Sequence, residues 1–502
     1  MLVVEGTVRN PVLVTLICAA CGGSSGGGDG GVNPDVGVPE ARCDAPALAD
    51  VSAPRATVGD GSPASCTAAA LQQAVAGGGV IVFACGADPV TITVSSTIMV
   101  TQETVIDGGG TVTLSGGGSA RILYLDSDYN TPTPRLTVQR LTFRDGASPA
   151  GGEDTAQGGA AIYRDGGSLT VIDSHFDNNH APSPGQDIAG GAIYGFGGGE
   201  IVISGTTFTN NTASDGGAVG SLNGDVTIIN STFAGNAASG TDGNPGNGGC
   251  GGAIYMDGGH EATTLCGVTI QNNTAGAIGG GFFRVSNDHT GTFAMDRSIV
   301  DNNRVTATAS GNAGGLYLEG LALNVTASTI SRNQGYYNGG IWINTCQAQL
   351  TNVTIAENVA FGSNGGGVWL GNSPTGTMTN CTIANNHSTA DSVVAGAIFG
   401  DGITLVNTIV ANNTAMYTPS CDVARSGGGG NLQWPDDGAP CTTSPLFADP
   451  QLGGLGDNGG GSETLLPAAA SPARGLATGC PATDQRGMPR GEPCTAGAVE
   501  AQ

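Results

Sequence analysis

A loose repeat with a period of roughly 29 residues is the feature of this sequence that most constrains its fold. Each unit carries a pair of small residues followed by an apolar and usually an aromatic residue, as in Gly190–Tyr194 and Asn338–Trp342. An apolar residue then precedes an Asn by three positions in nine successive units. These asparagines are Asn179, Asn211, Asn236, Asn273, Asn303, Asn333, Asn358, Asn386 and Asn413. Such a repeat predicts stacked units that bury their apolar faces against one another.

The pieces within each unit have the alternation of β-strands and lack the 3.6-residue period of a helix, as in Glu200–Ser204. The distance from the aromatic residue to the Asn is nearly constant in several units, so most length variation falls between the Asn and the next small pair. We therefore expect an all-β solenoid that closes one coil per repeat and has one variable loop per coil. Residues 68–76 are expected to form a short capping helix.

The asparagines and glycines of the repeat are predicted to be structural. Asn tolerates a left-handed backbone, and equivalent Asn side chains can hydrogen-bond from coil to coil as a ladder. The chain contains 88 Gly among 502 residues, and many of them form the small pairs, where they allow tight turns and close backbone approach.

The charge and the cysteine content indicate which partners and which compartment suit this protein. The sequence has 41 acidic residues against 16 basic ones, all of them Arg, and a net charge of −25. This field repels a polyanion, so a nucleic-acid partner is not expected. Thirteen Cys indicate an oxidising compartment.

The N-terminus has the pattern of an export signal. Residues 1–21 combine one Arg, a short apolar run and the sequence Cys18-Ala-Ala-Cys21. The segment resembles a bacterial lipoprotein signal, which implies lipid attachment at Cys21, and Gly22 after it would allow sorting to the outer membrane. An ordinary cleaved secretion signal is the alternative. Residues 22–60 are predicted to be a Gly-, Ser- and Pro-rich tether.

The remaining chain divides into a cap with the first coils (61–150), the β-helix repeats (151–417) and a C-terminal segment (418–502). Close cysteine pairs are expected to form disulfides that pin the ends: Cys66 with Cys85, Cys421 with Cys441, and Cys480 with Cys494. Cys250 with Cys266 and Cys346 with Cys381 are further suggestions. Cys43 is then unpaired or has a partner elsewhere.

Two family resemblances add to this interpretation. The repeat, in units such as Phe176-Asp-Asn-Asn179, resembles that of the chlamydial polymorphic outer-membrane proteins and related bacterial right-handed parallel β-helix proteins. Between Asp449-Pro-Gln-Leu and Gly497-Ala-Val-Glu500, the C-terminal segment resembles the bacterial choice-of-anchor Q family. The resemblances imply a right-handed, pectate-lyase-like β-helix at the cell surface, serving as an adhesion, display or envelope module.

A polysaccharide lyase or glycoside hydrolase of the same fold is the alternative function, because pectate lyases and polygalacturonases are parallel β-helices. Asp257 and Glu319 are the candidate carboxylate pair. They lie two coils apart, about 9.6 Å, at the edge of the range of inverting glycosidases. No metal site or cofactor is predicted, although the Gly- and Asp-rich stretch 240–247 could supply oxygen ligands to Ca²⁺. The expected partners are an outer-membrane lipid anchor, extracellular polysaccharide or another cell surface.

Overall fold

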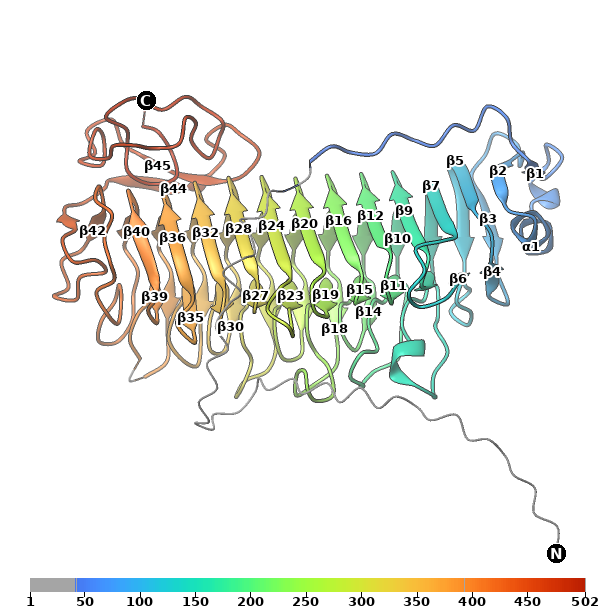
Figure 1. Ribbon diagram of the computed structural model, residues 1–502, viewed down its shortest axis with the longest axis horizontal. Helices are drawn as coiled ribbons and strands as arrows, with labels where there is room; N and C mark the ends of the chain where they lie inside the picture. The colour runs from blue at the N-terminus through green and yellow to red at the C-terminus, as the bar shows by residue number, and fades with distance from the viewer. Residues whose placement is uncertain (1–40, 42, 392, 502) are drawn as a thin grey trace, which may run out of the picture.

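Strands of successive repeats pair in parallel along the whole body of the protein and form an all-β, right-handed parallel β-helix (Figure 1). The computed structural model describes residues 41, 43–391 and 393–501. The predicted fold class is confirmed. At about 4.8 Å per coil, the eleven strands of one sheet span about 48 Å along the axis.

The first sheet carries the aromatic residues of the repeat and is called here the aromatic sheet. Its strands are β4 (Ile98–Val100), β6 (Leu123–Asp126), β8 (Ile162–Asp165), β11 (Ile193–Phe196), β15 (Val219–Leu222), β19 (Ile254–Asp257), β23 (Phe282–Val285), β27 (Leu316–Glu319), β31 (Ile341–Asn344), β35 (Val368–Gly371) and β39 (Ile398–Phe399).

A larger, 25-stranded sheet contributes two strands to most coils, a long one and a short one. The long row is β9 (Ser168–Ile172), β12 (Glu200–Ser204), β16 (Asp225–Ile229), β20 (Ala262–Cys266), β24 (Thr292–Asp296), β28 (Ala322–Thr326), β32 (Gln347–Thr351), β36 (Thr375–Thr379) and β40 (Ile403–Val406). The short row is β10 (His175–Asp177), β13 (Thr207–Thr209), β17 (Thr232–Ala234), β21 (Thr269–Gln271), β25 (Ile299–Asp301), β29 (Thr329–Ser331), β33 (Thr354–Ala356), β37 (Thr382–Ala384) and β41 (Ile409–Ala411).

The remaining strands close each coil and both ends. A row of two-residue strands comprises β14 (Thr212–Ala213), β18 (Ala237–Ala238), β22 (Thr274–Ala275), β26 (Arg304–Val305), β30 (Gln334–Gly335), β34 (Val359–Ala360) and β38 (His387–Ser388). The larger sheet begins with β1 (Ala56–Val58), β2 (Gly79–Phe83), β3 (Val90–Thr93), β5 (Thr104–Ser115) and β7 (Arg135–Arg144), and ends with β42 (Leu432–Trp434) and β43 (Leu446–Phe447). The helix α1 (Ala68–Ala76) caps the first coils as expected, because Leu71, Ala74 and Val75 face the core.

The apolar residue three positions before each ladder Asn lies in the buried core of the solenoid. Phe143, Phe176, Phe208 and Phe233 are buried and stack in sequence, with ring centroids 4.6–4.8 Å apart. Later coils place Ile or Val at this position. The repeated residue is therefore the central contact between one coil and the next.

The repeated asparagines form a continuous buried ladder beside this stack. Asn303 shows the pattern: its Oδ1 accepts from the backbone N–H and the Nδ2 of Asn273, at 3.0 and 2.9 Å. Its Nδ2 donates to Oδ1 of Asn333 at 3.0 Å and to the Ile270 carbonyl at 2.9 Å. The same bonds run from Asn179 to Asn413.

The expectation that the ladder asparagines themselves adopt a left-handed backbone was wrong. The residue before each of them has the positive φ, as in Asn302 (φ 52°) and Asn412 (φ 56°). The preceding residue forms the turn after the short strand, and its side chain points outward. After this turn the side chain of the ladder Asn points into the interior, where its amide pairs with the amides of the neighbouring coils.

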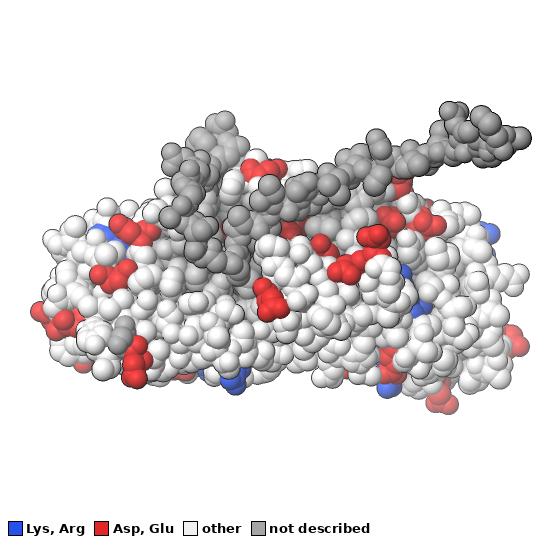
Figure 2. All heavy atoms as spheres, turned by 90° about the horizontal axis from the view of Figure 1, so that it is seen from below, with Lys and Arg blue, Asp and Glu red and all other residues white. Residues whose placement is uncertain are grey.

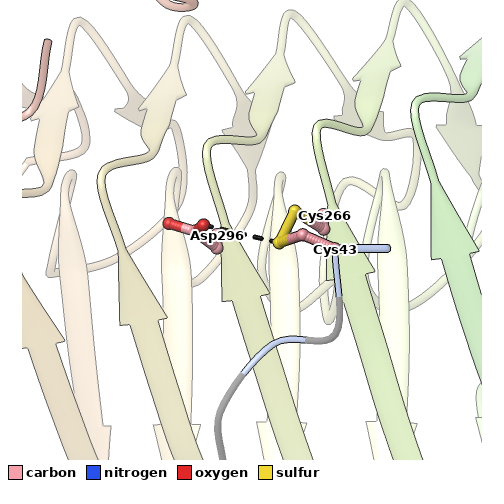
Figure 3. A group of neighbouring side chains, drawn as sticks. All are labelled: Cys43, Cys266 and Asp296. Carbon is pink, nitrogen blue, oxygen red and sulfur yellow. Dashed lines mark hydrogen bonds between the residues drawn. A yellow bond between two sulfur atoms is a disulfide. The ribbon is translucent and has the colours of Figure 1, made fainter. Parts of the chain in front are cut away.

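The N-terminal segment 43–55 runs back along the outside of the solenoid toward the cap (Figure 1). A disulfide fixes its start, Cys43, to Cys266 at the end of β20, and Asp296 of the next coil lies beside the two sulfurs (Figure 3). Further along, the backbone N–H of Ala49 donates to Oε1 of Gln139 at 2.8 Å. Part of the predicted tether is therefore fixed against the solenoid.

The C-terminal segment folds back over the outside of the last short strands, with β44 (Leu452–Gly456) and β45 (Thr464–Pro467) forming a small antiparallel pair. These coils present alanines outward, and Ala384 packs against the segment with Ala356 and Ala411. Gln485 fixes it with polar contacts: its Oε1 accepts from Thr354 Oγ1 at 2.6 Å, and its Nε2 donates to Thr329 Oγ1 at 2.8 Å.

The structure joins the three close cysteine pairs, Cys66–Cys85, Cys421–Cys441 and Cys480–Cys494. The other two suggestions were wrong. Cys266 pairs with Cys43 instead of Cys250, because the N-terminal segment passes directly over β20. Cys346 and Cys381 are buried thiols on different coils of the core.

Candidate functional site

A row of aromatic rings lines the outer face of the aromatic sheet, with one ring in each strand from β6 to β39 except β15, where Gly220 takes the position. Tyr317, Trp342 and Trp369 occupy the same register position of β27, β31 and β35, and Phe399 continues the row in β39. Ring centroids are 5.9 Å apart between Tyr317 and Trp342, 4.5 Å between Trp342 and Trp369, and 4.4 Å between Trp369 and Phe399. Parallel pairing in strict register turns a single motif position into a continuous aromatic surface.

The loops that connect the two-residue strands to the aromatic sheet determine how far each aromatic ring is exposed to solvent. Over the earlier coils, loop residues such as Ala189 and Ile278 pack onto the rings, so that Tyr194 and Tyr255 are fully buried. Over the last coils the cover is thinner: the loop residue Tyr337 contacts Trp369 edge-on, with ring centroids 6.3 Å apart, and Trp342, Trp369 and Phe399 are half-buried. These three rings are called here the aromatic platform.

Polar side chains lie beside the platform, two positions farther along each strand. Glu319, Asn344 and Gly371 share this register position, and Nδ2 of Asn372 donates to Oδ1 of Asn344 at 2.9 Å. The Tyr317 hydroxyl donates to Glu319. Burial raises the pKa of Glu319, while the hydrogen bonds from Tyr317 and Asn344 lower it in part. Asn344 is buried, so the exposed amide beside the rings is that of Asn372. Flat rings with such an amide beside them match a ligand with apolar ring faces and hydroxyl edges.

The candidate catalytic pair lies on the same sheet, where Asp257 of β19 and Glu319 of β27 are separated by the strand β23. Asp257 is only 4% exposed. Its Oδ1 accepts from Nδ2 of Asn287 at 2.9 Å, and its Oδ2 accepts from Nδ2 of Asn244 at 2.7 Å. Protein groups thus hold both oxygens of Asp257. The prediction that this pair is catalytic stays untested.

A second surface feature is a shallow polar groove of about 650 Å³ at the turns that follow the short strands. It is lined by Asn302, Arg332, Gln334, Glu357, Asn385, His387 and Asn412. Arg332 in this groove is neutralised by ion pairs with Asp301 at 2.7 Å and with Glu463 at 2.5 Å. None of these lining residues is a Phe, Tyr or Trp.

Sequence reasoning placed the aromatic residues in the repeat but did not find the platform. The available signal was the change from Tyr and Phe to Trp at positions 342 and 369, the largest rings of the series. The proposed lipid-attachment residue, Cys21, lies outside the described residues. Within the described chain, no helix is long and apolar enough to span a membrane.

The family comparison matches this geometry. The family model described as right handed beta helix region covers residues 223–415. This part of the chain is a right-handed β-helix region. No curated protein matches the sequence significantly. The narrower resemblances of this β-helix, to the chlamydial and choice-of-anchor Q families, stay predictions.

Three solved β-helix structures illustrate the fold neighbours. The periplasmic alginate epimerase AlgG is 11% identical, with a TM-score of 0.40 over 74% of this chain and 85% of that one. The A-module of mannuronan C-5 epimerase AlgE6 from Azotobacter vinelandii is 15% identical, with a TM-score of 0.35 over 73% and 95%. PfbA, a surface adhesin of Streptococcus pneumoniae, is 12% identical, with a TM-score of 0.29 over 75% and 87%. At these values the neighbours, enzymes and adhesin alike, carry no argument about function.

Proposed function

We propose that this protein is an exported surface module that binds neutral polysaccharide through the aromatic platform without cleaving it. The observation that carries the proposal is the half-buried row Trp342–Trp369–Phe399 with Asn344 and Asn372 beside it. Aromatic side chains supply a large contact area at a small cost in conformational entropy, and the exposed amide of Asn372 fixes orientation. Through such binding the protein would attach the cell envelope to a polysaccharide surface or display the polysaccharide on it.

The charge of the protein favours a neutral ligand. The sequence carries a net charge of −25, and acidic side chains outnumber Arg on the face in Figure 2. Near the platform, the charged group of the polar row is the carboxyl of Glu319. A polyanionic polysaccharide would meet repulsion of the same sign on approach.

The state of the candidate carboxylates supports binding over cleavage. A glycosidase needs one carboxyl group at the leaving oxygen and another at the sugar carbon or its water. Asp257 is buried under Asn244 and Asn287, and Glu319 accepts a hydrogen bond from Tyr317. Asp257 is only 4% exposed, so a sugar ring has little access to it.

Export and anchoring are part of the proposal. Four disulfides in the described chain are typical of an oxidising compartment. We place a lipid on Cys21 as the anchor. Labelling of cells with a fatty-acid probe should mark the protein, and a Cys21→Ala variant should lose the label; label that persists in the variant would refute this site.

Binding is tested by affinity electrophoresis of the purified protein in gels that contain neutral or acidic polysaccharides. Trp369→Ala should weaken retardation by a neutral polysaccharide tenfold or more, as expected for a central aromatic contact. Trp434→Ala is the matched control, because Trp434 is 37% exposed on the last coils but outside the platform.

Equal retardation of the Trp369→Ala variant and the original protein would reject the platform as the binding site. Release of reducing ends is measured on the same polysaccharides. Chain cleavage that Asp257→Ala or Glu319→Gln abolishes would replace the binding proposal with the enzymatic one.

A further inference from the structure

Two acidic side chains, Asp187 and Asp257, contact the same hydroxyl beneath the loops that cover the earlier part of the aromatic row, and Asp215 lies within electrostatic reach of Asp187. Asp187 and Asp215 come from the loops before β11 and β15, and Asp257 ends β19. Asp215 and Asp257 are buried, whereas Asp187 is partly exposed. The charges nearest to Asp187 are the carboxylates of Asp257 and Asp154, so the site concentrates negative charge.

The hydroxyl of Tyr255 joins two of these carboxylates. Its Oη lies 3.0 Å from Oδ1 of Asp187 and 3.0 Å from Oδ2 of Asp257, and it accepts from Nδ2 of Asn244 at 2.6 Å. A phenol carries a single proton and can donate to only one of the two carboxylates. The other contact sets oxygen lone pairs against each other unless a proton or a cation lies between them.

A second observation points to a ligand in the same place. The hydroxyl of Tyr194 is fully buried and has no hydrogen-bond partner among the described residues, and it lies within electrostatic reach of Asp187, Asp257 and Asp215. Oδ1 of Asn244 and Oδ2 of Asp215 are likewise buried without such a partner. Buried polar atoms are normally satisfied, and all three atoms here are oxygens.

The two carboxylates face the same hydroxyl of Tyr255, and buried oxygens without a hydrogen-bond partner lie in the same region. A cation at this place would compensate the like charges of Asp187 and Asp257 and supply the missing partner. The partial exposure of Asp187 gives such an ion a route from solvent.

We propose that Asp187 and Asp257 bind a divalent cation, with oxygens of Tyr194 and Asn244 as further ligands. Ca²⁺ fits best, because it takes six to eight oxygen ligands in adaptable geometry, whereas Mg²⁺ demands a near-ideal octahedron and retains its waters. The cation would tie the loop 182–188 to the loop 240–249, which already touch where Gly246 N–H donates to Oε1 of Gln186. The site does not depend on polysaccharide binding.

The test is calorimetric titration of the purified protein with CaCl₂ at pH 7.5 after removal of metal with EDTA. One saturable site is expected, with a rise in the unfolding temperature on addition of Ca²⁺ and weaker binding of Mg²⁺. Asp187→Asn keeps the shape of the side chain and should weaken Ca²⁺ binding at least tenfold. Asp401→Asn, which removes one charge from an exposed turn, should bind Ca²⁺ like the original protein.

Folding of the variants is checked by circular dichroism in EDTA. If Asp187→Asn does not fold, Tyr194→Phe serves instead, because it removes one oxygen ligand and keeps the ring; it should also weaken Ca²⁺ binding. Absence of saturable binding up to about 10 mM Ca²⁺, beyond the range of weak extracellular sites, would overturn the proposal. Equal affinity in the original protein and Asp187→Asn would overturn it as well.

Discussion

Removal of one side chain from the asparagine ladder should destabilise the solenoid strongly. The Asn303→Ala substitution removes four hydrogen bonds, two accepted from Asn273 and one donated to each of Asn333 and Ile270. The backbone N–H of Asn273 is left buried without this partner, which costs about 1–3 kcal/mol, and the other lost bonds contribute about 1 kcal/mol each. We expect the free energy of unfolding to fall by about 4–6 kcal/mol.

Denaturant unfolding followed by circular dichroism measures this change. Asn302→Gly is the matched control, because residue 302 is exposed and has a positive φ that Gly adopts freely. The effect of an exposed substitution of this kind should stay within about 0.5 kcal/mol. The double variant Asn273→Ala, Asn303→Ala should cost less than the sum of the two single variants, because the bonds between these side chains are lost only once. A loss below about 1 kcal/mol for Asn303→Ala would refute the ladder as a main source of stability.

Three further predictions concern cysteine and aspartate side chains. Cys43→Ala removes a disulfide whose cysteines are 223 residues apart, so the free energy of unfolding should fall by up to about 5 kcal/mol. Residues 43–55 should also become accessible to protease. Unchanged stability and protease resistance would show that this disulfide does not hold the segment against the solenoid. Burial raises the pKa of Cys346 and of Cys381 to about 12, so neither thiol should react with iodoacetamide in the native protein at pH 8. Modification of either residue, detected by mass spectrometry, would contradict their burial. Burial and the charge of Asp257 raise the pKa of Asp187 to about 6. In EDTA this should contribute about 3 kcal/mol of stability that is fully present below about pH 4 and is lost as the pH rises through 6, a pH dependence that Asp187→Asn should remove from denaturant unfolding curves.

Much of the fold could be predicted because it repeats in the sequence. The spacing of Phe176 and Asn179, repeated coil after coil, identifies the central stack and the ladder, and sequence-local pairs such as Cys66 with Cys85 lie close in any coil. The error about backbone conformation arose within Asn-Asn pairs such as Asn302-Asn303, where both residues favour turns and only the fold decides which one bends the chain.

The candidate site was harder to predict, because it depends on what covers the repeat. Tyr255 and Trp369 stand at equivalent repeat positions, yet loops bury the first and leave the second half-buried. The partner of Cys43 was also hidden, since Cys266 is 223 residues away and meets it only because the chain folds back along the solenoid. Asp187 likewise meets Asp257 only because a loop of one coil reaches over the coils that follow it.

The disulfide between Cys43 and Cys266 also decides how mechanical force enters this molecule. A force applied at residue 43 passes through the disulfide directly into β20, which lies near the middle of the solenoid (Figure 1). The cap and the coils before β20 lie outside that path and carry no load. Consider the chain before residue 43 held at a surface while a ligand pulls on the platform. The force then crosses only the coils between β20 and β39. These coils are loaded in shear as whole units, and no strand is peeled from the end of the solenoid.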